Sequence, residues 1–158
     1  MRNIFFILCC FLTLSLCAQN GVYRIVNVNS GMALDVPNGS KNDGEQIIQW
    51  DFHGGDNQKW KITPTNDGYF FIKSVMTGKS LDVPSGSKEN GTKIIQWAFH
   101  GGDNQKWKLE KQSDGSYCIY SKMTGKYLAV PNGSKENGAK IIQWTGHKGA
   151  NQRWKLIM

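Results

Sequence analysis

The tryptophans and histidines are this chain's main candidates for ligand chemistry, because they recur at a fixed interval. All six tryptophans and all three histidines lie at positions repeated every 47 residues: Trp50, Trp97 and Trp144; Trp60, Trp107 and Trp154; and His53, His100 and His147. Asp35 and Asp82 share this interval. A carboxylate accepts hydrogen bonds from neighbouring hydroxyls, an aromatic ring covers an apolar C–H face, and an amide or imidazole completes the edge. The combination suits a hydroxyl-rich ligand such as a sugar.

The acidic residues do not form the pair that hydrolysis of a glycosidic bond requires. A glycosidase needs two carboxyl groups about 5 to 10 Å apart. Asp35 and Asp82 belong to different repeats, and no second acid is repeated beside either of them. Asp51 and Asp56 are the nearest candidates, but Ala98 replaces Asp51 in the second repeat. The sequence carries no Ser/His/Asp, phosphate-loop or zinc-protease motif, so we expect a protein that binds without catalysis.

The three histidines allow three interpretations. Each is a contact at the rim of a ligand site, or a solvated loop residue, or one ligand of a three-His metal site on a threefold axis, which is a chemically sound set. No repeated residue requires a metal or another cofactor, and we expect none.

These residues are carried by three similar units with no linker between them. Asp35-Val36-Pro37 recurs as Asp82-Val83-Pro84, and the segment Ile47–Trp50 recurs at 94–97 and 141–144. The units cover about 21–67, 68–114 and 115–158, which we call lobes one, two and three. Each alternates short β-type runs with turn clusters, and none offers a long helical period. Three units are too few for an ordinary propeller, so we expect one all-β globule with pseudo-threefold symmetry.

The repeats also indicate the core. The apolar positions that persist at period two or without variation are Tyr23, Phe70 and Tyr117; Ile25, Ile72 and Ile119; and Leu34, Leu81 and Leu128. The intervening position holds Arg24, Phe71 and Cys118, which predicts the other face of the strand. Cys118 is therefore either an exposed thiol or a buried, inert cysteine, and the residue type favours burial.

A Gln-x-Trp motif closes each unit, at Gln58–Trp60, Gln105–Trp107 and Gln152–Trp154. In its motif, spacing and three copies, the chain from 21 to 158 resembles the ricin-B-like (R-type) lectins and related carbohydrate-binding modules. The resemblance implies a β-trefoil of twelve strands, four per lobe, with one shallow sugar pocket available in each lobe. It also implies that Gln58 and Trp60 are structural and lie outside the site.

The resemblance carries the sugar site onto an aspartate, the aromatic residue 15 positions later, and polar groups in the following turn. In lobe one these residues are Asp35, Trp50, His53 and Asn57, and in lobe two they are Asp82, Trp97, His100 and Asn104. Each tryptophan either stacks on a sugar or packs in the core, because strand alternation places Trp50 on the same face as Ile48.

Lobe three departs from this pattern. Ala129 replaces the aspartate although Leu128, Val130 and Pro131 are retained, so the fold tolerates loss of the acid. The following turn, 145–151, has also lost an aromatic residue, a glycine and an acid. We expect a weak or inactive third site.

Length and charge restrict the remaining interpretations. The chain has 158 residues, 39% hydrophobic and 20% charged, which fits one globular domain. Its formal net charge is +7, but the lysines recur with the repeat, as at Lys41, Lys88 and Lys135, so they are spread over the surface. We therefore expect glycan partners and no nucleic acid.

The first residues predict export from the cytoplasm. Residues 1–18 combine Arg2, an apolar run and a small-residue exit, as in a secretory signal peptide, with 19–158 as the secreted domain. A lipid anchor at Cys17 is the alternative. Cys118 is the one cysteine after residue 18, so no internal disulfide is expected. We expect a monomer without membrane insertion, with a Cys118-linked dimer as the alternative.

Two questions stay open at this stage. A trefoil that acts through protein contacts, such as a protease inhibitor, is the alternative function. Asn38, Asn90 and Asn132 begin glycosylation sequons, which matter only in a eukaryote. The sequence names neither the sugar nor the biological role.

Overall fold

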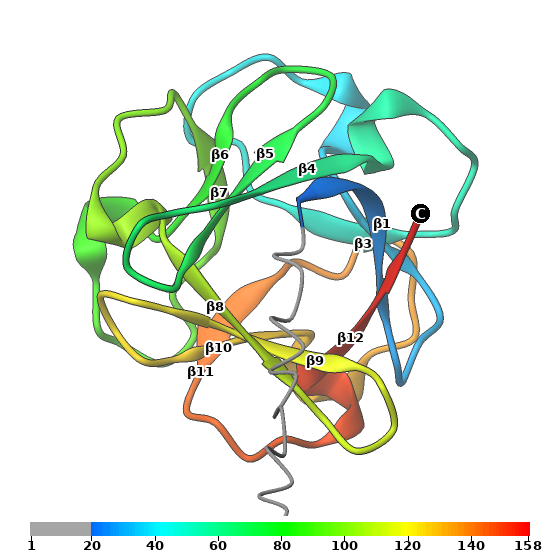
Figure 1. Cartoon of the computed structure of the whole chain (residues 1–158). Coiled ribbons are helices and arrows are strands. Elements are labelled where there is room, and N and C mark those ends of the chain that lie inside the picture. Colours follow the sequence, from blue (N-terminus) through cyan, green and yellow to red (C-terminus); the bar gives the residue numbers. More distant parts are fainter. Residues whose placement is uncertain (1–19) are drawn as a thin grey trace, which may run out of the picture.

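The computed structural model describes residues 20–158, so the predicted signal peptide and Cys17 lie outside the described residues. The structure is all-β, with twelve strands and six single-turn 3₁₀ segments. Each lobe contributes four strands, and the lobes follow one another around the centre of the molecule (Figure 1). The predicted β-trefoil with twelve strands is confirmed. Within residues 20–158, no helix has the length and apolar character needed to cross a membrane.

Six strands form a closed barrel. They are β1 (Gly21–Asn27), β4 (Trp60–Pro64), β5 (Phe70–Ser74), β8 (Trp107–Lys111), β9 (Tyr117–Ser121) and β12 (Arg153–Ile157). Antiparallel pairing runs from β1 to β4, β5, β8, β9 and β12, and β12 pairs again with β1. Closure leaves no free sheet edge in the barrel.

The other six strands form three hairpins attached to the barrel. They are β2 (Ala33–Asp35) with β3 (Ile48–Trp50), β6 (Ser80–Asp82) with β7 (Ile95–Trp97), and β10 (Tyr127–Ala129) with β11 (Ile142–Trp144). A ring of backbone hydrogen bonds joins the lobes: the Ile47 N–H donates to the Ile94 carbonyl at 2.9 Å, Ile94 to Ile141 at 3.0 Å, and Ile141 to Ile47 at 2.9 Å. This ring occupies the pseudo-threefold axis.

The 3₁₀ segments lie beside these hairpins. They are η1 (Pro37–Gly39), η3 (Pro84–Gly86) and η5 (Pro131–Gly133) after the first hairpin strand, and η2 (Asp56–Gln58), η4 (Asp103–Gln105) and η6 (Ala150–Gln152) before the last strand of each lobe. In η1, η3 and η5 the middle residue and the glycine both have a φ between +53° and +61°. Glycine is suited to this left-handed conformation because it has no Cβ.

The core contains the residues that the repeat pattern predicts. Ile25, Leu34 and their copies are fully buried, Tyr23 and Tyr117 are nearly so, and Phe70 packs against the core from a half-buried position. The second set of tryptophans is fully buried as well. Each donates an indole N–H to a leucine carbonyl of its own lobe: Trp60 to Leu34, Trp107 to Leu81, and Trp154 to Leu128. Their predicted structural role is confirmed.

Candidate functional site

A surface hollow in lobe one, which we call site one, brings together all four residues predicted there. Asp35 comes from the end of β2, Trp50 from the end of β3, His53 from the following loop, and Asn57 from η2. The segment η1 forms another part of the wall. The hairpin and the loop after it therefore converge on one small surface.

Asp35 is the buried polar centre of site one. Its residue is only 3% exposed, and both carboxylate oxygens accept hydrogen bonds from the Asn57 amide at 3.2 Å. The His53 Nε2 atom lies 3.8 Å from Oδ2. Burial raises the pKa of the Asp35 carboxyl, and hydrogen bonds from Gln58 and Asn57 together with the nearby imidazole oppose that rise. The carboxylate is fixed in place while its charge is only partly compensated.

Site two repeats this arrangement in lobe two, again with all four predicted residues lining one hollow. Asp82 is 2% exposed and accepts a hydrogen bond from the Asn104 amide at 3.1 Å. The His100 Nε2 atom is 3.6 Å from its carboxylate, and burial again raises the pKa of the Asp82 carboxyl. Two lobes thus hold equivalent, almost buried acids.

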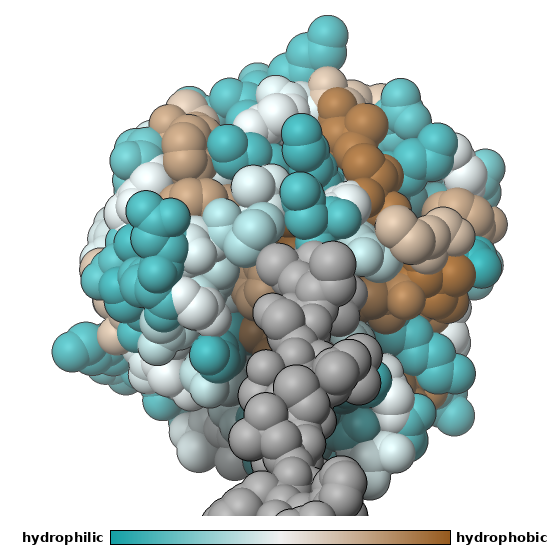
Figure 2. All heavy atoms as spheres, viewed as in Figure 1, coloured by the Kyte–Doolittle hydropathy of each residue, from teal (hydrophilic) through white to brown (hydrophobic). Residues whose placement is uncertain are grey.

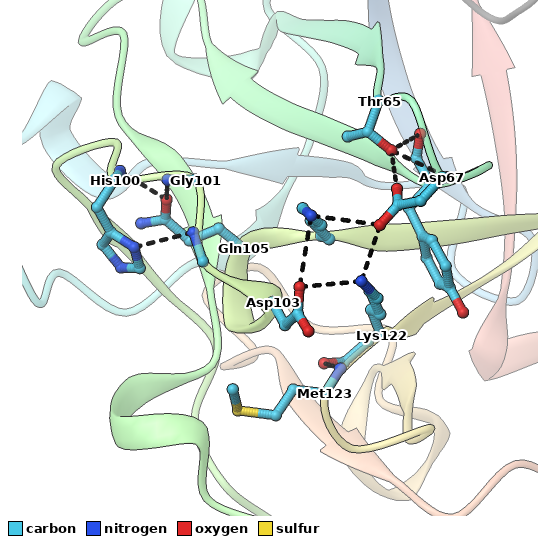
Figure 3. Close-up of polar contacts among 12 residues, drawn as sticks. Thr65, Asp67, His100, Gly101, Asp103, Gln105, Lys122 and Met123 are labelled. Atoms are coloured by element: carbon cyan, nitrogen blue, oxygen red, sulfur yellow. Dashed lines mark hydrogen bonds and ion pairs between the residues drawn. The ribbon is translucent and has the colours of Figure 1, made fainter.

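The glutamine of the closing motif is closer to the site than the resemblance implies. The Gln105 amide donates to Asp82 Oδ2 at 2.8 Å. The Gln105 side-chain oxygen accepts hydrogen bonds from the backbone N–H groups of His100 and Gly101, as Figure 3 shows. Gln105 is fully buried, so it positions both the acid and the loop without reaching the surface. Its place next to Asn104 in the sequence is the signal that would have revealed this role.

The tryptophans at the ends of the hairpins are not core residues. Trp50, Trp97 and Trp144 are each 42–44% exposed, so the core-packing alternative is wrong for all three. The edge of each indole lies near a glycine of another lobe. For Trp50 this glycine is Gly138, on which a Cβ would lie 3.7 Å from the ring. An exposed ring beside a buried carboxylate can stack on an apolar ligand face.

Site three keeps its shape but lacks the acid. Ala129 is 1% exposed where the other lobes have aspartate, and the hollow is still lined by Trp144, His147 and Asn151. Its volume of about 500 Å³ is close to the 530 Å³ of site one. The Asn151 amide donates to the Val130 carbonyl at 3.0 Å, just as Asn57 does to Val36. The frame survives without a carboxylate.

The histidines do not meet on the axis. His53, His100 and His147 line three separate hollows, so the three-His interpretation is wrong. In residues 20–158, no group of three or more His, Cys, Asp or Glu side chains has the geometry to hold a metal ion.

Cys118 is fully buried in β9, which confirms the buried interpretation and makes the exposed thiol wrong. Burial raises the pKa of the thiol to about 11.

On the face seen in Figure 2, hydrophilic residues surround separate apolar patches.

The family follows from a comparison with known sequences. Residues 11–97 and 103–157 match the model of a family described as a ricin-type beta-trefoil lectin domain-like. The chain belongs to this family. The ricin-type resemblance drawn from the repeats is confirmed, and similar solved structures include lectins of this architecture.

Two solved structures share 42% sequence identity with this ricin-type chain. One is a designed threefold-symmetric protein, ThreeFoil, with a TM-score of 0.86 over 88% of this chain and 99% of that one. The other is an exo-β-1,3-galactanase from Clostridium thermocellum, with a TM-score of 0.84 over 87% of this chain but only 30% of that one. The Macrolepiota procera ricin B-like lectin was solved in complex with lactose and is 23% identical to this chain. The match covers 87% of this chain and 95% of that lectin with a TM-score of 0.74, which shows that the two share a fold.

Proposed function

We propose that this protein is a secreted lectin that binds glycans non-covalently at sites one and two. The observation that carries the proposal is an almost buried aspartate beside an exposed tryptophan, in one hollow and in two lobes. The carboxylate accepts hydroxyl hydrogen bonds, the indole covers the sugar ring, and asparagine and histidine contact the edge. Site three, which has Ala129, binds weakly or not at all.

Binding without catalysis is part of this proposal. The partners of Asp35 and Asp82 are amides and an imidazole, whereas glycoside hydrolysis needs a second carboxyl group facing the same bond. The galactanase is a longer chain, of which the aligned part is 30%, so its activity does not transfer to this chain. Burial of Cys118 argues against the disulfide-linked dimer and favours a monomer.

The test is a broad glycan and polysaccharide array, with lactose and β-1,3-galactan included. The purified protein is compared with the Asp35→Ala/Asp82→Ala variant and with Asp56→Ala, which removes an exposed acid of η2 outside the hollow. We expect binding that the double variant loses and Asp56→Ala keeps. A folded wild-type protein that binds no glycan would contradict the proposal and favour a protein partner.

A further inference from the structure

Each of the two acidic sites receives one side chain from the next lobe. Met76, in the β5–β6 turn of lobe two, lines site one, and Met123, in the β9–β10 turn of lobe three, lines site two. Both are 40% exposed, so the side chains are open to a molecule that enters the hollow. Neither residue belongs to the set predicted from the sequence.

The methionines rest on the left-handed glycines of η1 and η3. A Cβ on Gly39 would lie 2.9 Å from the Met76 sulfur, and a Cβ on Gly86 would overlap the Met123 sulfur. Each thioether therefore extends the wall that the 3₁₀ segment begins. The proline and the thioether make this wall more apolar than the side formed by the carboxylate, amide and imidazole, although Asn38 or Ser85 also lines it.

The backbone of each turn is fixed from both sides. The Val75 N–H donates to the Lys59 carbonyl at 2.9 Å, and the Thr77 hydroxyl donates to Gln96 at 3.0 Å, so Met76 lies between two anchored residues. The equivalent bonds beside Met123 join Lys122 to Lys106 and Thr124 to Gln143. The Lys122 ammonium is also paired with Asp67 and Asp103, and Met123 points away from this network (Figure 3).

Site three provides the internal comparison, because the next lobe around the axis is lobe one. The residue equivalent to Met76 and Met123 is Asn29, whose amide donates to the Gly133 carbonyl at 2.8 Å. The same turn and the same backbone thus accept a polar residue, so the fold does not require methionine. Methionine occurs at the two sites that have aspartate, and asparagine occurs at the site that has alanine.

We propose that Met76 and Met123 determine specificity by contacting a methyl substituent of the bound sugar. This inference rests on the proposed function. The exposed tryptophan covers the C–H face of the ring and the polar groups take its hydroxyls, which leaves the thioether for a further apolar group. In sugars that group is the methyl of an N-acetyl substituent or of a 6-deoxy carbon. Thioethers adapt well to small apolar partners.

The experiment labels the methionine ε-methyl groups with ¹³C and follows them by NMR. The free sugars galactose, N-acetylgalactosamine and 6-deoxy-D-galactose (D-fucose) are titrated, together with glucose and N-acetylglucosamine, so that galactose and glucose are the methyl-free parents. We expect the Met76 and Met123 signals to shift most with the methyl-bearing sugars, while Met32, which lines none of the three hollows, stays unchanged. Comparing the N-acetyl and 6-deoxy sugars identifies which methyl group is contacted.

Affinities decide between a ligand contact and a structural role. Wild-type protein should prefer the methyl-bearing sugar by about fourfold, the factor for one buried CH₂ group. Met76→Asn/Met123→Asn should reduce that ratio to about one with the parent sugar still bound, and Met76→Leu/Met123→Leu should keep it. Binding without a methyl preference, or a preference that survives the asparagine variant, overturns this inference alone. No sugar binding by wild type contradicts the proposed function itself.

Discussion

Asp35 and Asp82 are buried where a charge is unfavourable, and they persist in only two of the three lobes. Because burial raises the pKa of both carboxyls, each acid lowers the free energy of unfolding once it ionises in the native state. Asn57 and Asn104 recover part of this loss through their hydrogen bonds. A buried acid that ionises unfavourably, at a position where lobe three keeps the fold with alanine, is best explained by a role in binding.

We predict that Asp35→Ala/Asp82→Ala is at least as stable as wild type at pH 7 in the absence of ligand. Asn151 shows that the amide keeps its bond to the backbone carbonyl when alanine replaces the acid. Because the pKa of each acid is raised in the native state, the wild-type protein gains stability as the pH falls and the two acids bind protons. The stability advantage of the variant should therefore decrease as the pH falls through the native pKa toward 3.8. Urea unfolding from pH 7 to pH 4 measures this. A variant that is less stable at pH 7 would give the acids a structural role.

Cys118 leads to a second prediction at this scale. The thiol is fully buried with a pKa of about 11, so it should not react with a disulfide reagent at pH 8 while the protein is folded. Reaction should follow unfolding in guanidinium chloride. Thiol counts are compared with Cys118→Ser, which should lack this one group in denaturant. Fast labelling of the native wild-type thiol would restore the disulfide-linked dimer as an alternative.

At the scale of elements, a buried glutamine on each hairpin connects neighbouring lobes. Gln96 in β7 donates to the carbonyls of Ser40 and Asn42 at 2.8 and 3.0 Å, and accepts from Thr77. Gln49 and Gln143 make equivalent contacts, so the three connections form a cycle. Each one also accepts a hydrogen bond from the hydroxyl of the residue that follows residue 29, 76 or 123.

We predict that Gln96→Ala lowers the free energy of unfolding by about 2–4 kcal/mol. The change leaves two carbonyls without their donor and creates a small cavity at a fully buried position. Gln112→Ala is the matched control, because the Gln112 amide bonds only within its own hairpin, to Glu110, and its loss should cost little. Chemical denaturation measures both. Equal effects of the two substitutions would remove the proposed importance of the contact between lobes.

The same glutamines explain why the sequence predicts some elements better than others. Ile25, Leu34 and Trp60 are predicted as structural because local periodicity and the repeat determine their burial. In β3 the period-two rule also holds, but the buried position beside Trp50 is Gln49, and a polar residue there suggests solvent. Hydropathy alone therefore leaves the face of Trp50 undecided.

Contacts between lobes are harder to predict than contacts within them. Asp35, Trp50, His53 and Asn57 meet in one hollow because a single hairpin and its loop carry them. Met76 belongs to the following lobe, and its approach to Gly39 depends on how the closed barrel places two repeats side by side. No spacing within one repeat encodes that distance. Comparing the repeats gives an indirect sign of this contact. Methionine at 76 or 123 accompanies aspartate at 35 or 82, whereas asparagine at 29 accompanies alanine at 129.

At the scale of the whole molecule, the backbone ring on the axis holds the three hollows in fixed relative positions. If the proposed function holds, sites one and two offer two sugar pockets on one rigid body, which favours a polymer or a glycan-dense surface over a free monosaccharide. Site three has the same frame, with Trp144, His147 and Asn151 in place. Its lack of a carboxylate is the main difference from the other two.

We predict that Ala129→Asp creates a third functional site. Asn151 and Gln152 occupy the positions of Asn104 and Gln105, which hold the carboxylate in site two. Isothermal titration with a monosaccharide should give a stoichiometry that rises from two to three, and binding to an immobilised glycan should strengthen by more than the added site alone. With a methyl-bearing sugar, the third site should be the weakest because Asn29 replaces the methionine.

Ala150→Asp is the matched control, since it adds the same charge in lobe three at the start of η6, outside the hollow. Its stoichiometry should remain two. A folded Ala129→Asp protein that still binds two sugars would mean that the acid is not the decisive group in these pockets. The loop 145–151, with its lost aromatic residue and glycine, would then be the cause of the difference between the lobes.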